Sequence, residues 1–256
     1  MLNGTYFRYL IEVQYEGTAF HGSQIQGAQQ TVQGALNNAL SIVLRQPIST
    51  LGASRTDEGV HAQSNFYHFD YSTILSSKLI YSLNAILPQS LAVKALYRFK
   101  DQNANARFDA IKRSYRYRIC FRKNPFTYQR AYLFPYTINH EVLIQSAQMI
   151  LQHQEFESFC KKNSQNKTFK CQIFESTWEQ YPEELHYVVS ANRFLRGMVR
   201  ALVGTQLRLA RGQYTLQEFE QILHSKNTSK TDFSVPGFGL YLEAIHYPEG
   251  LFEPII

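Results

Sequence analysis

The segment best suited to carry chemistry is GASRTDEGVHA, residues 52–62. Arg55 and Asp57 stand two positions apart in it, so both side chains point to the same side of an extended chain. A guanidinium close to a carboxylate lowers the pKa of that carboxylate and keeps it ionised. An ionised carboxylate that is held in place can act as a nucleophile or stabilise a sugar cation. Asp57 is a candidate for either role, although a surface ion pair in a turn is the commoner reason for an Arg-x-Asp sequence.

Other residues and motifs limit the kinds of reaction that this segment can catalyse. Glu58 points the other way in the same extended geometry, which speaks against a glycosidase-like pair of carboxylates. Gly59 allows a tight turn or a close approach to a ligand. His21 and His61 lack HxxxH or HExxH spacing, so we predict hydrogen-bonding histidines and no metal site. The chain also lacks a GxGxxG or GxxxxGK[ST] motif, so we expect no nucleotide cofactor.

Strands and helices alternate along the chain, and they have to position this segment. Runs of β-branched and aromatic residues predict strands, whereas apolar residues at 3.6-residue spacing predict helices. The predicted strands cover residues 6–15, 49–54, 65–71, 91–99, 114–121, 171–180, 185–191 and 239–247. The predicted helices run from the N-cap Thr31 to before Pro47, from near Ser76 to before Pro88, and over 140–152, 193–210 and 215–225.

Each half of the chain therefore reads as strand–helix–strand–strand–helix–strand. This order predicts an α+β fold of two ferredoxin-like halves, with mostly antiparallel sheets flanked by helices and an active-site cleft between them. The polar stretch 100–106 has no periodicity, so we place the domain boundary there. Residues 1–103 would form an N-terminal α+β domain carrying the aspartate, and residues 104–256 a C-terminal α+β domain completing the cleft.

Composition restricts the class of protein. Of the 256 residues, 44% are hydrophobic and 18% charged, which is typical of a globular chain without a membrane-spanning helix. A net charge of +6 and 14% aromatic residues suit nucleic acid, although a tyrosine-rich sheet protein with a basic surface has the same composition. The N-terminus does not read as a signal peptide. The three cysteines form no CxxC pair, so we predict no disulfide scaffold or cysteine zinc site, and a cytoplasmic location.

Residues 55–62, RTDEGVHA, resemble the signature of the TruA family of tRNA pseudouridine synthases. Further resemblances follow in the family order: YEGTAFHGSQIQ (15–26), TVQGALNNAL (31–40), RSYRYRI (113–119), ANRFLRGMVRALVG (191–204) and GLYLEAIHYPE (239–249). They extend over nearly the whole chain. The resemblance implies an isomerase that converts uridine to pseudouridine at positions 38–40 of the anticodon stem-loop of tRNA. It also implies a homodimer that needs no cofactor.

The resemblance also implies roles for single residues. Asp57 matches the catalytic aspartate, Tyr115 an active-site tyrosine that packs against the target base, and Arg200 a basic residue that pairs with the aspartate. Leu240 matches an apolar residue of the base pocket. Two segments match places that contact tRNA: Ala104, Asn105, Ala106, Arg107 and Phe108, and Asn163, Ser164, Gln165, Asn166 and Lys167. Asp57 would attack C1′ of the sugar, attack C6 of the base or remove a sugar proton, and the sequence does not choose among these.

Two of these positions have plainer interpretations. A tyrosine in an alternating strand, such as Tyr115, is commonly a half-buried packing residue. Arg193, Arg196 and Arg200 share one face of the predicted helix 193–210, and such a stripe is either a solvated face or a phosphate contact.

The chain departs from the family pattern near the candidate site. Ser23 stands where the family usually has Trp, Ile25 where it often has a basic residue, Ser54 where it commonly has Gly and Glu58 where it commonly has Ala. We expect these departures to alter substrate preference and affinity more than chemistry. Two other functions remain open: an RNA-binding protein that has lost activity, and a glycosidase acting on a soluble sugar. The glycosidase would need a second carboxyl group about 5–9.5 Å from Asp57.

Overall fold

The computed structural model describes residues 6–162 and 166–256, and it divides into two compact units. The first unit comprises Met1–Ile111 and Leu242–Ile256, and the second comprises Lys112–Tyr241. The division therefore differs from the expected boundary at residues 103 and 104. The polar stretch 100–106 belongs to the first unit, and the C-terminal residues join that unit because β10 (Phe252–Pro254) pairs with β4 (Leu91–Phe99).

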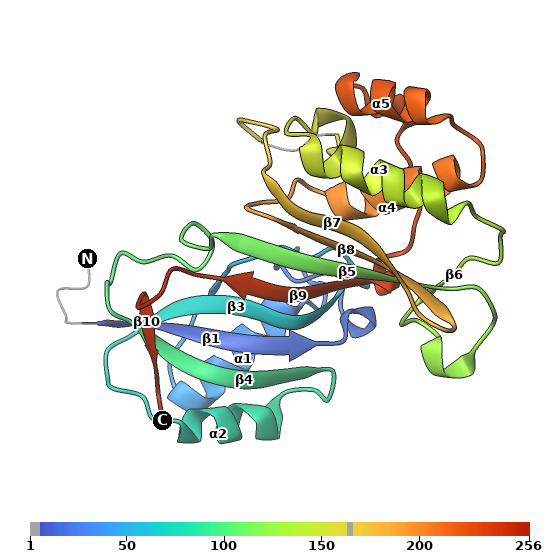
Figure 1. Ribbon diagram of the computed structural model, residues 1–256. Helices are drawn as coiled ribbons and strands as arrows, with labels where there is room; N and C mark the ends of the chain where they lie inside the picture. Colours follow the sequence, from blue (N-terminus) through green and yellow to red (C-terminus); the bar gives the residue numbers. More distant parts are fainter. Residues whose placement is uncertain (1–5, 163–165) are drawn as a thin grey trace. The chain divides into compact units, whose positions relative to one another are not determined.

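The sheet of the first unit is built around β1 (Phe7–Tyr15). This strand pairs antiparallel with β3 (His61–Tyr71) on one side and with β4 on the other. Figure 1 shows β4, β1 and β3 side by side. The short β2 (Leu51–Gly52) pairs with β3, which gives the order β4-β1-β3-β2 of a ferredoxin-like unit. Five of the nine residues of this central strand are buried, and all five are apolar or aromatic: Tyr9, Leu10, Ile11, Val13 and Tyr15.

Two helices complete this unit. In α1 (Val32–Leu44), the Thr31 hydroxyl accepts a hydrogen bond from the backbone N–H of Gly34 at 3.2 Å, which confirms the predicted N-cap. The second helix, α2 (Lys78–Ile86), contacts α1 and β4. Buried Leu36 and Leu40 of α1 and buried Leu83 of α2 give each helix an apolar face. In Figure 1, α1 is seen behind the strands of this sheet.

The second unit also combines antiparallel strands with helices. Here β5 (Lys112–Cys120) pairs antiparallel with β8 (Glu184–Ala191), which pairs antiparallel with β7 (Ile173–Gln180). Helices α3 (His140–Gln152), α4 (Met198–Ala210) and α5 (Leu216–His224) gather beside these strands (Figure 1). The remaining elements are β6 (Tyr132–Leu133), β9 (Leu240–His246) and the 3₁₀ helices Gly17–Ala19, Pro125–Thr127, Glu157–Phe159, Thr228–Lys230 and Gly237–Gly239.

The predicted α+β fold with mostly antiparallel pairing is confirmed, but one predicted helix is wrong at its start. The sequence predicts a helix over 193–210, whereas α4 begins at Met198. Gly197 is the N-cap of α4 and has a φ of 72°, a left-handed conformation. The residues before Gly197 therefore do not continue the helix. Arg193 and Arg196 lie before this helix, so they do not form a helical stripe with Arg200.

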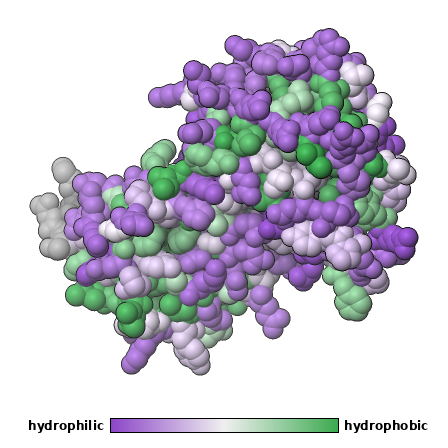
Figure 2. Space-filling model, viewed as in Figure 1, coloured by the Kyte–Doolittle hydropathy of each residue, from purple (hydrophilic) through white to green (hydrophobic). Residues whose placement is uncertain are grey.

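The face of the molecule shown in Figure 2 is largely hydrophilic, as expected for a globular chain. Figure 2 shows hydrophilic residues over much of the face in view, with hydrophobic residues in separate smaller groups. Within the described residues, the helices are all too short or too polar to cross a membrane.

Candidate active site

Asp57 begins a tight turn shortly after β2. The backbone N–H of Val60 donates to the carbonyl of Asp57 at 3.2 Å, and Gly59 has a φ of 77°. A positive φ at the third position of such a turn favours glycine, which confirms the predicted turn. Asp57 is half-buried and the next residue, Glu58, is exposed. The turn therefore holds Asp57 at the surface of a rigid scaffold.

Ser23 fixes the chain immediately before Asp57. The backbone N–H of Ser23 donates to the carbonyl of Thr56 at 3.0 Å, and the N–H of Thr56 donates to Oγ of Ser23 at 2.8 Å. The Thr56 hydroxyl also shares a hydrogen bond of 2.8 Å with the Tyr15 hydroxyl. All three residues are buried, so these bonds are shielded from water and restrict the position of Asp57.

Three further hydrogen bonds support the turn. The side-chain N–H₂ of buried Asn65 donates to the Tyr15 hydroxyl at 3.1 Å and to the carbonyl of Ser54 at 3.0 Å. On the far side of the turn, the N–H of Gly17 donates to Nδ1 of His61 at 3.1 Å. His61 is therefore a hydrogen-bonding histidine, as predicted. A Cβ on Gly17 would lie 2.1 Å from the carbonyl oxygen of Val60, so only glycine fits there.

Arg55 does not contact Asp57 in the way that the spacing suggests. Within the described chain, no hydrogen bond or ion pair joins the two side chains, and Arg55 is exposed. The chain leaves the strand at Gly52, so the alternation of an extended strand does not apply to residues 55 and 57. Glu58 instead lies 3.3 Å from Nδ1 of His21, and both side chains are largely exposed. Such a pair contributes little to stability.

Tyr115 lies in the middle of β5, opposite Val189 of β8. It is 6% exposed, and its ring packs edge-on against Phe194, with ring centroids 5.1 Å apart and an interplanar angle of 87°. This geometry is favourable for aromatic pairs. Tyr115 is therefore more buried than the half-exposed position that strand alternation suggests, and its ring is held by the segment before α4.

Arg200 and Leu240 are linked through the chain that leads into β9. Arg200 lies in the first turn of α4, and its Nε donates to the carbonyl of Val235 at 2.8 Å. The Tyr117 hydroxyl donates to the carbonyl of Pro236 at 2.8 Å, and burial raises the pKa of Tyr117 well above its usual range. A Cβ on Gly239 would lie 2.7 Å from the Tyr117 ring. These contacts fix the approach to Leu240, the buried first residue of β9.

The first predicted RNA-contact segment, residues 104–108, exposes only part of its side chains. Ala104 and Ala106 are buried, and the Ala106 backbone donates to His68 Nδ1 at 3.3 Å and accepts from the Tyr247 hydroxyl at 2.7 Å. Arg107 and Phe108 are exposed, and half-buried Asn105 accepts from their backbone N–H groups at 2.9 and 3.3 Å.

In the other segment, Asn163, Ser164 and Gln165 lie outside the described residues. Asn166 accepts from Arg193 at 3.2 Å, and Lys167 is exposed. No group of three His, Cys, Asp or Glu side chains suited to a metal ion occurs within residues 6–162 and 166–256.

The contacts that hold Asp57 were not found by sequence reasoning. The sequence marks Ser23 only as a departure from the family pattern, and no motif marks Tyr15, Thr56 or Asn65 as site residues. Each of these contacts joins residues at least eleven positions apart. No spacing rule connects such residues, so the sequence offered no signal for them.

The α+β fold of the chain is consistent with the fold of pseudouridine synthases. A family model described as tRNA pseudouridine synthase matches residues 147–248. Proteins named tRNA pseudouridine synthase A from Parabacteroides distasonis and Bacteroides fragilis are 37% and 38% identical to the chain, over 96% of it and 98% of their own lengths. The protein of that name from Bacillus subtilis is 32% identical over 92% of the chain and 97% of its own length. The chain belongs to the tRNA pseudouridine synthase family, and it is an isomerase.

Proposed function

We propose that the chain converts uridine to pseudouridine in tRNA, at positions 38–40 of the anticodon stem-loop. The observation that carries this proposal is the Asp57 turn, because Ser54 and Thr56, which precede it, are held by hydrogen bonds with Ser23, Tyr15 and Asn65. The relatives' names support tRNA as the substrate. The anticodon stem-loop rests on the resemblance in the sequence, and so does action as a homodimer.

The reaction breaks the C1′–N1 bond of uridine and joins C1′ to C5. The C5 proton is lost and N1 gains a proton, so nothing enters or leaves overall. Three roles for the Asp57 carboxylate satisfy this balance: attack on C1′, attack on C6, or removal of a sugar proton that gives a glycal-type intermediate. Each role requires an ionised carboxylate whose position is fixed before the substrate arrives. The turn described above supports that requirement.

The proposal also assigns functions to the other site residues: Tyr115, Leu240, Arg200 and Arg55. The target base leaves its stack at a cost of a few kcal/mol and is received by Tyr115 and Leu240. Arg200 pairs with Asp57, and Arg55 acts next to it in the chain. The edge-on packing of Tyr115 on Phe194 and the hydrogen bond from Arg200 to Val235 support these roles, because they hold both side chains in single conformations.

Binding of the tRNA phosphates is assigned to exposed basic residues such as Arg107 and Lys167. Phosphate contacts position the RNA and make its affinity dependent on salt. We also propose a cytoplasmic location, since the three cysteines are buried and form no disulfide. No cofactor takes part in the proposed reaction.

The test follows tritium release from C5-labelled uridine, in whole tRNA and in an isolated anticodon stem-loop. Wild type is compared with Asp57→Ala and Asp57→Asn, and Glu58→Gln serves as the control because it changes the adjacent, exposed carboxylate. We expect release by wild type and the control only, with RNA affinity almost unchanged in the two Asp57 variants.

Other results identify the alternative functions. RNA binding without release by wild type would favour an inactive RNA-binding protein. Failure to bind RNA at low salt would favour the glycosidase. Turnover that survives in both Asp57 variants would remove Asp57 from the mechanism.

A further inference from the structure

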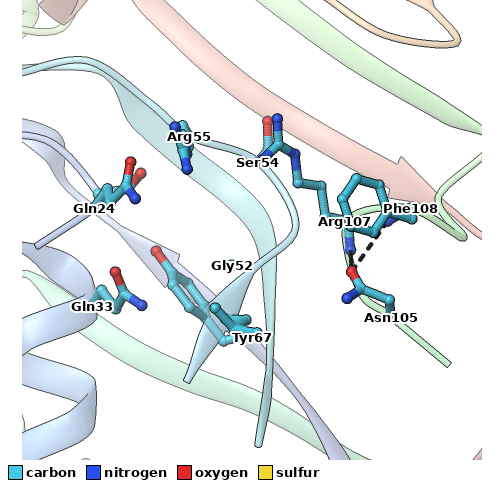
Figure 3. Close-up of a pocket in the computed structure, with 11 residues that line it drawn as sticks. Gln24, Gln33, Gly52, Ser54, Arg55, Tyr67, Asn105, Arg107 and Phe108 are labelled. Carbon is cyan, nitrogen blue, oxygen red and sulfur yellow. Dashed lines mark hydrogen bonds between the residues drawn. The ribbon is translucent and has the colours of Figure 1, made fainter. Parts of the chain in front are cut away.

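The second unit presents an aromatic and basic surface that the candidate active site does not explain. A pocket of about 130 Å³ in the first unit is lined by Ser23, Ser54 and Arg55, among others, so it is part of the candidate active site (Figure 3). The surface in the second unit is the segment 122–130, which lies between β5 and β6 and is called here the 122–130 turn. In Figure 1 this segment projects from the strands of its unit beside β6.

Two large aromatic side chains of the 122–130 turn face solvent. Phe126 is 90% exposed and Tyr128 is 74% exposed. Aromatic side chains gain most of their stabilising energy from burial, which these two rings do not obtain within the chain. Exposed apolar residues that stand together, and not singly, mark a surface that binds a partner.

The backbone that carries these rings is fixed by hydrogen bonds. Asn124 caps the 3₁₀ helix Pro125–Thr127: its Oδ1 accepts from the N–H of Phe126 at 3.0 Å, and its carbonyl accepts from the N–H of Thr127 at 3.1 Å. The N–H of Ala131 donates to the carbonyl of Thr127 at 3.0 Å. A partner that binds a fixed backbone does not have to order it first, which favours affinity.

A further hydrogen bond attaches the 122–130 turn to the strand that begins with Leu240. The Tyr241 hydroxyl donates to the carbonyl of Arg130 at 2.8 Å, and Tyr241 follows Leu240 in β9. Leu240 belongs to the proposed base pocket. Adjacent side chains of a strand point to opposite faces, so the turn is attached close to this pocket without being part of it.

The charged residues of the 122–130 turn are all positive. Arg122, Lys123 and Arg130 are exposed, and within the part of the chain that the structure describes they form no ion pair. The sequence has no Asp or Glu between Asp109 and Glu141. A positive surface fits the phosphates of RNA. It does not fit the same surface of a second copy, because a symmetric contact would bring like charges together.

We propose that the 122–130 turn is a second RNA-contact site, which stacks unpaired bases of the substrate on Phe126 and Tyr128. These bases are other than the uridine that is isomerised, and the three cations bind the adjoining phosphates. Exposed rings beside cations bind single-stranded nucleic acid in this way. The inference rests on the proposed function for its choice of tRNA. It gives the second unit a part in positioning the RNA.

The test measures the Kd of the full-length protein for tRNA and for the anticodon stem-loop. Phe126→Ala removes a stacking surface and should raise Kd about fivefold to a hundredfold, whereas Phe126→Trp keeps a ring and should stay within about threefold of wild type. The matched control is Tyr81→Ala, because Tyr81 is 81% exposed but lies on α2 of the first unit. Single-turnover conversion at saturating RNA should stay within about twofold of wild type in all three variants.

Two further readouts report the contact directly. The chain has one tryptophan, so Phe126→Trp introduces a second one whose emission a stacked base should quench. RNA should quench this variant more strongly than Tyr81→Trp. The double variant Arg122→Gln, Lys123→Gln removes two phosphate contacts and should reduce the slope of log K against log salt by about 1.4–1.8.

Several results would overturn the proposal. These are a wild-type Kd for Phe126→Ala, equal quenching in the two tryptophan variants, or a wild-type salt slope for the double variant. Sedimentation tests a second copy as the partner: an oligomer that Phe126→Ala dissociates would assign the turn to contacts between copies and also overturn the RNA site.

The proposed function and this RNA-contact site can fail separately. If wild type forms no pseudouridine but Phe126→Ala still weakens RNA binding, the proposed function fails and the contact site remains. If wild type is active and Phe126→Ala binds RNA as wild type does, only the contact site fails. Loss of affinity for both RNAs supports a contact with the stem-loop, and loss for tRNA alone supports a contact elsewhere on the tRNA.

Discussion

Ser23 and Thr56 hold each other through two reciprocal hydrogen bonds. The Ser23 N–H reaches the Thr56 carbonyl at 3.0 Å, and the Thr56 N–H reaches the Ser23 hydroxyl at 2.8 Å. The serine that departs from the family pattern is thus a structural part of the candidate active site. It joins the loop before α1 to the residue that precedes Asp57.

Ser23→Ala should destabilise the protein and reduce its turnover. The change leaves the buried N–H of Thr56 without an acceptor, which costs about 1–3 kcal/mol of unfolding free energy. Urea unfolding measures this loss, and tritium release measures turnover. Ser82→Ala is the control, because its hydroxyl only donates back to a helix carbonyl, that of Lys78, at 3.2 Å. Equal stability of the two variants would contradict the importance of the Ser23–Thr56 contact.

Gly59→Ala should lower turnover more than its effect on stability explains. An alanine at a φ of 77° strains the backbone by about 1 kcal/mol and shifts the turn that holds Asp57. Gly250→Ala pays a similar strain at a φ of 74° and lies near Lys100. Comparison of unfolding free energy and turnover in both variants tests the prediction. A similar loss of turnover in both would show that general strain, and not the Asp57 turn, is responsible.

Acidification should destabilise the first unit through His68. Burial, followed by the charge of Arg8, lowers the pKa of His68 below its usual value of about 6.5. The unfolded chain therefore takes up this proton first, so the contribution to stability is lost as the pH falls below about 6.5, down to the lower pKa of the folded state. His68→Gln should reduce the loss of unfolding free energy between pH 7.5 and pH 5. An unchanged loss in this variant would show that other groups carry the effect.

Arg107→Gln should weaken the salt dependence of RNA binding. Loss of one phosphate contact reduces the slope of log K against log salt by about 0.7–0.9. A titration of tRNA at several salt concentrations measures this slope. Lys78→Gln is the matched control, since it removes an exposed charge of the same unit on α2. The phosphate role of Arg107 is contradicted if both variants keep the wild-type slope.

Local patterns predicted the elements well where a single period runs through the whole element. The predicted strand 91–99 and helix 140–152 coincide with β4 and α3. The helix predicted from residue 193 failed at its start because the left-handed glycine at 197 interrupts a run of otherwise suitable residues. The three residues of β10 are too few for any periodicity, and they form a strand only because β4 offers them an edge.

In the candidate site, too, features with a local sequence signal could be predicted and the others could not. The turn at Asp57 could be predicted, because glycine two positions later is a local signal. The spacing also suggests that the Arg55 and Asp57 side chains point to the same side, but this alternation applies only within a strand, and β2 ends at Gly52.

The pairing of β10 with β4 has a consequence for biosynthesis. The first unit needs the last residues of the chain, so its outer strand keeps one edge open while the ribosome makes the whole second unit. At typical elongation rates this interval is on the order of ten seconds. An open edge can recruit a strand from another nascent chain. The charged side chains of Lys94 and Arg98 on β4 discourage such pairing until the C-terminus emerges and closes the edge.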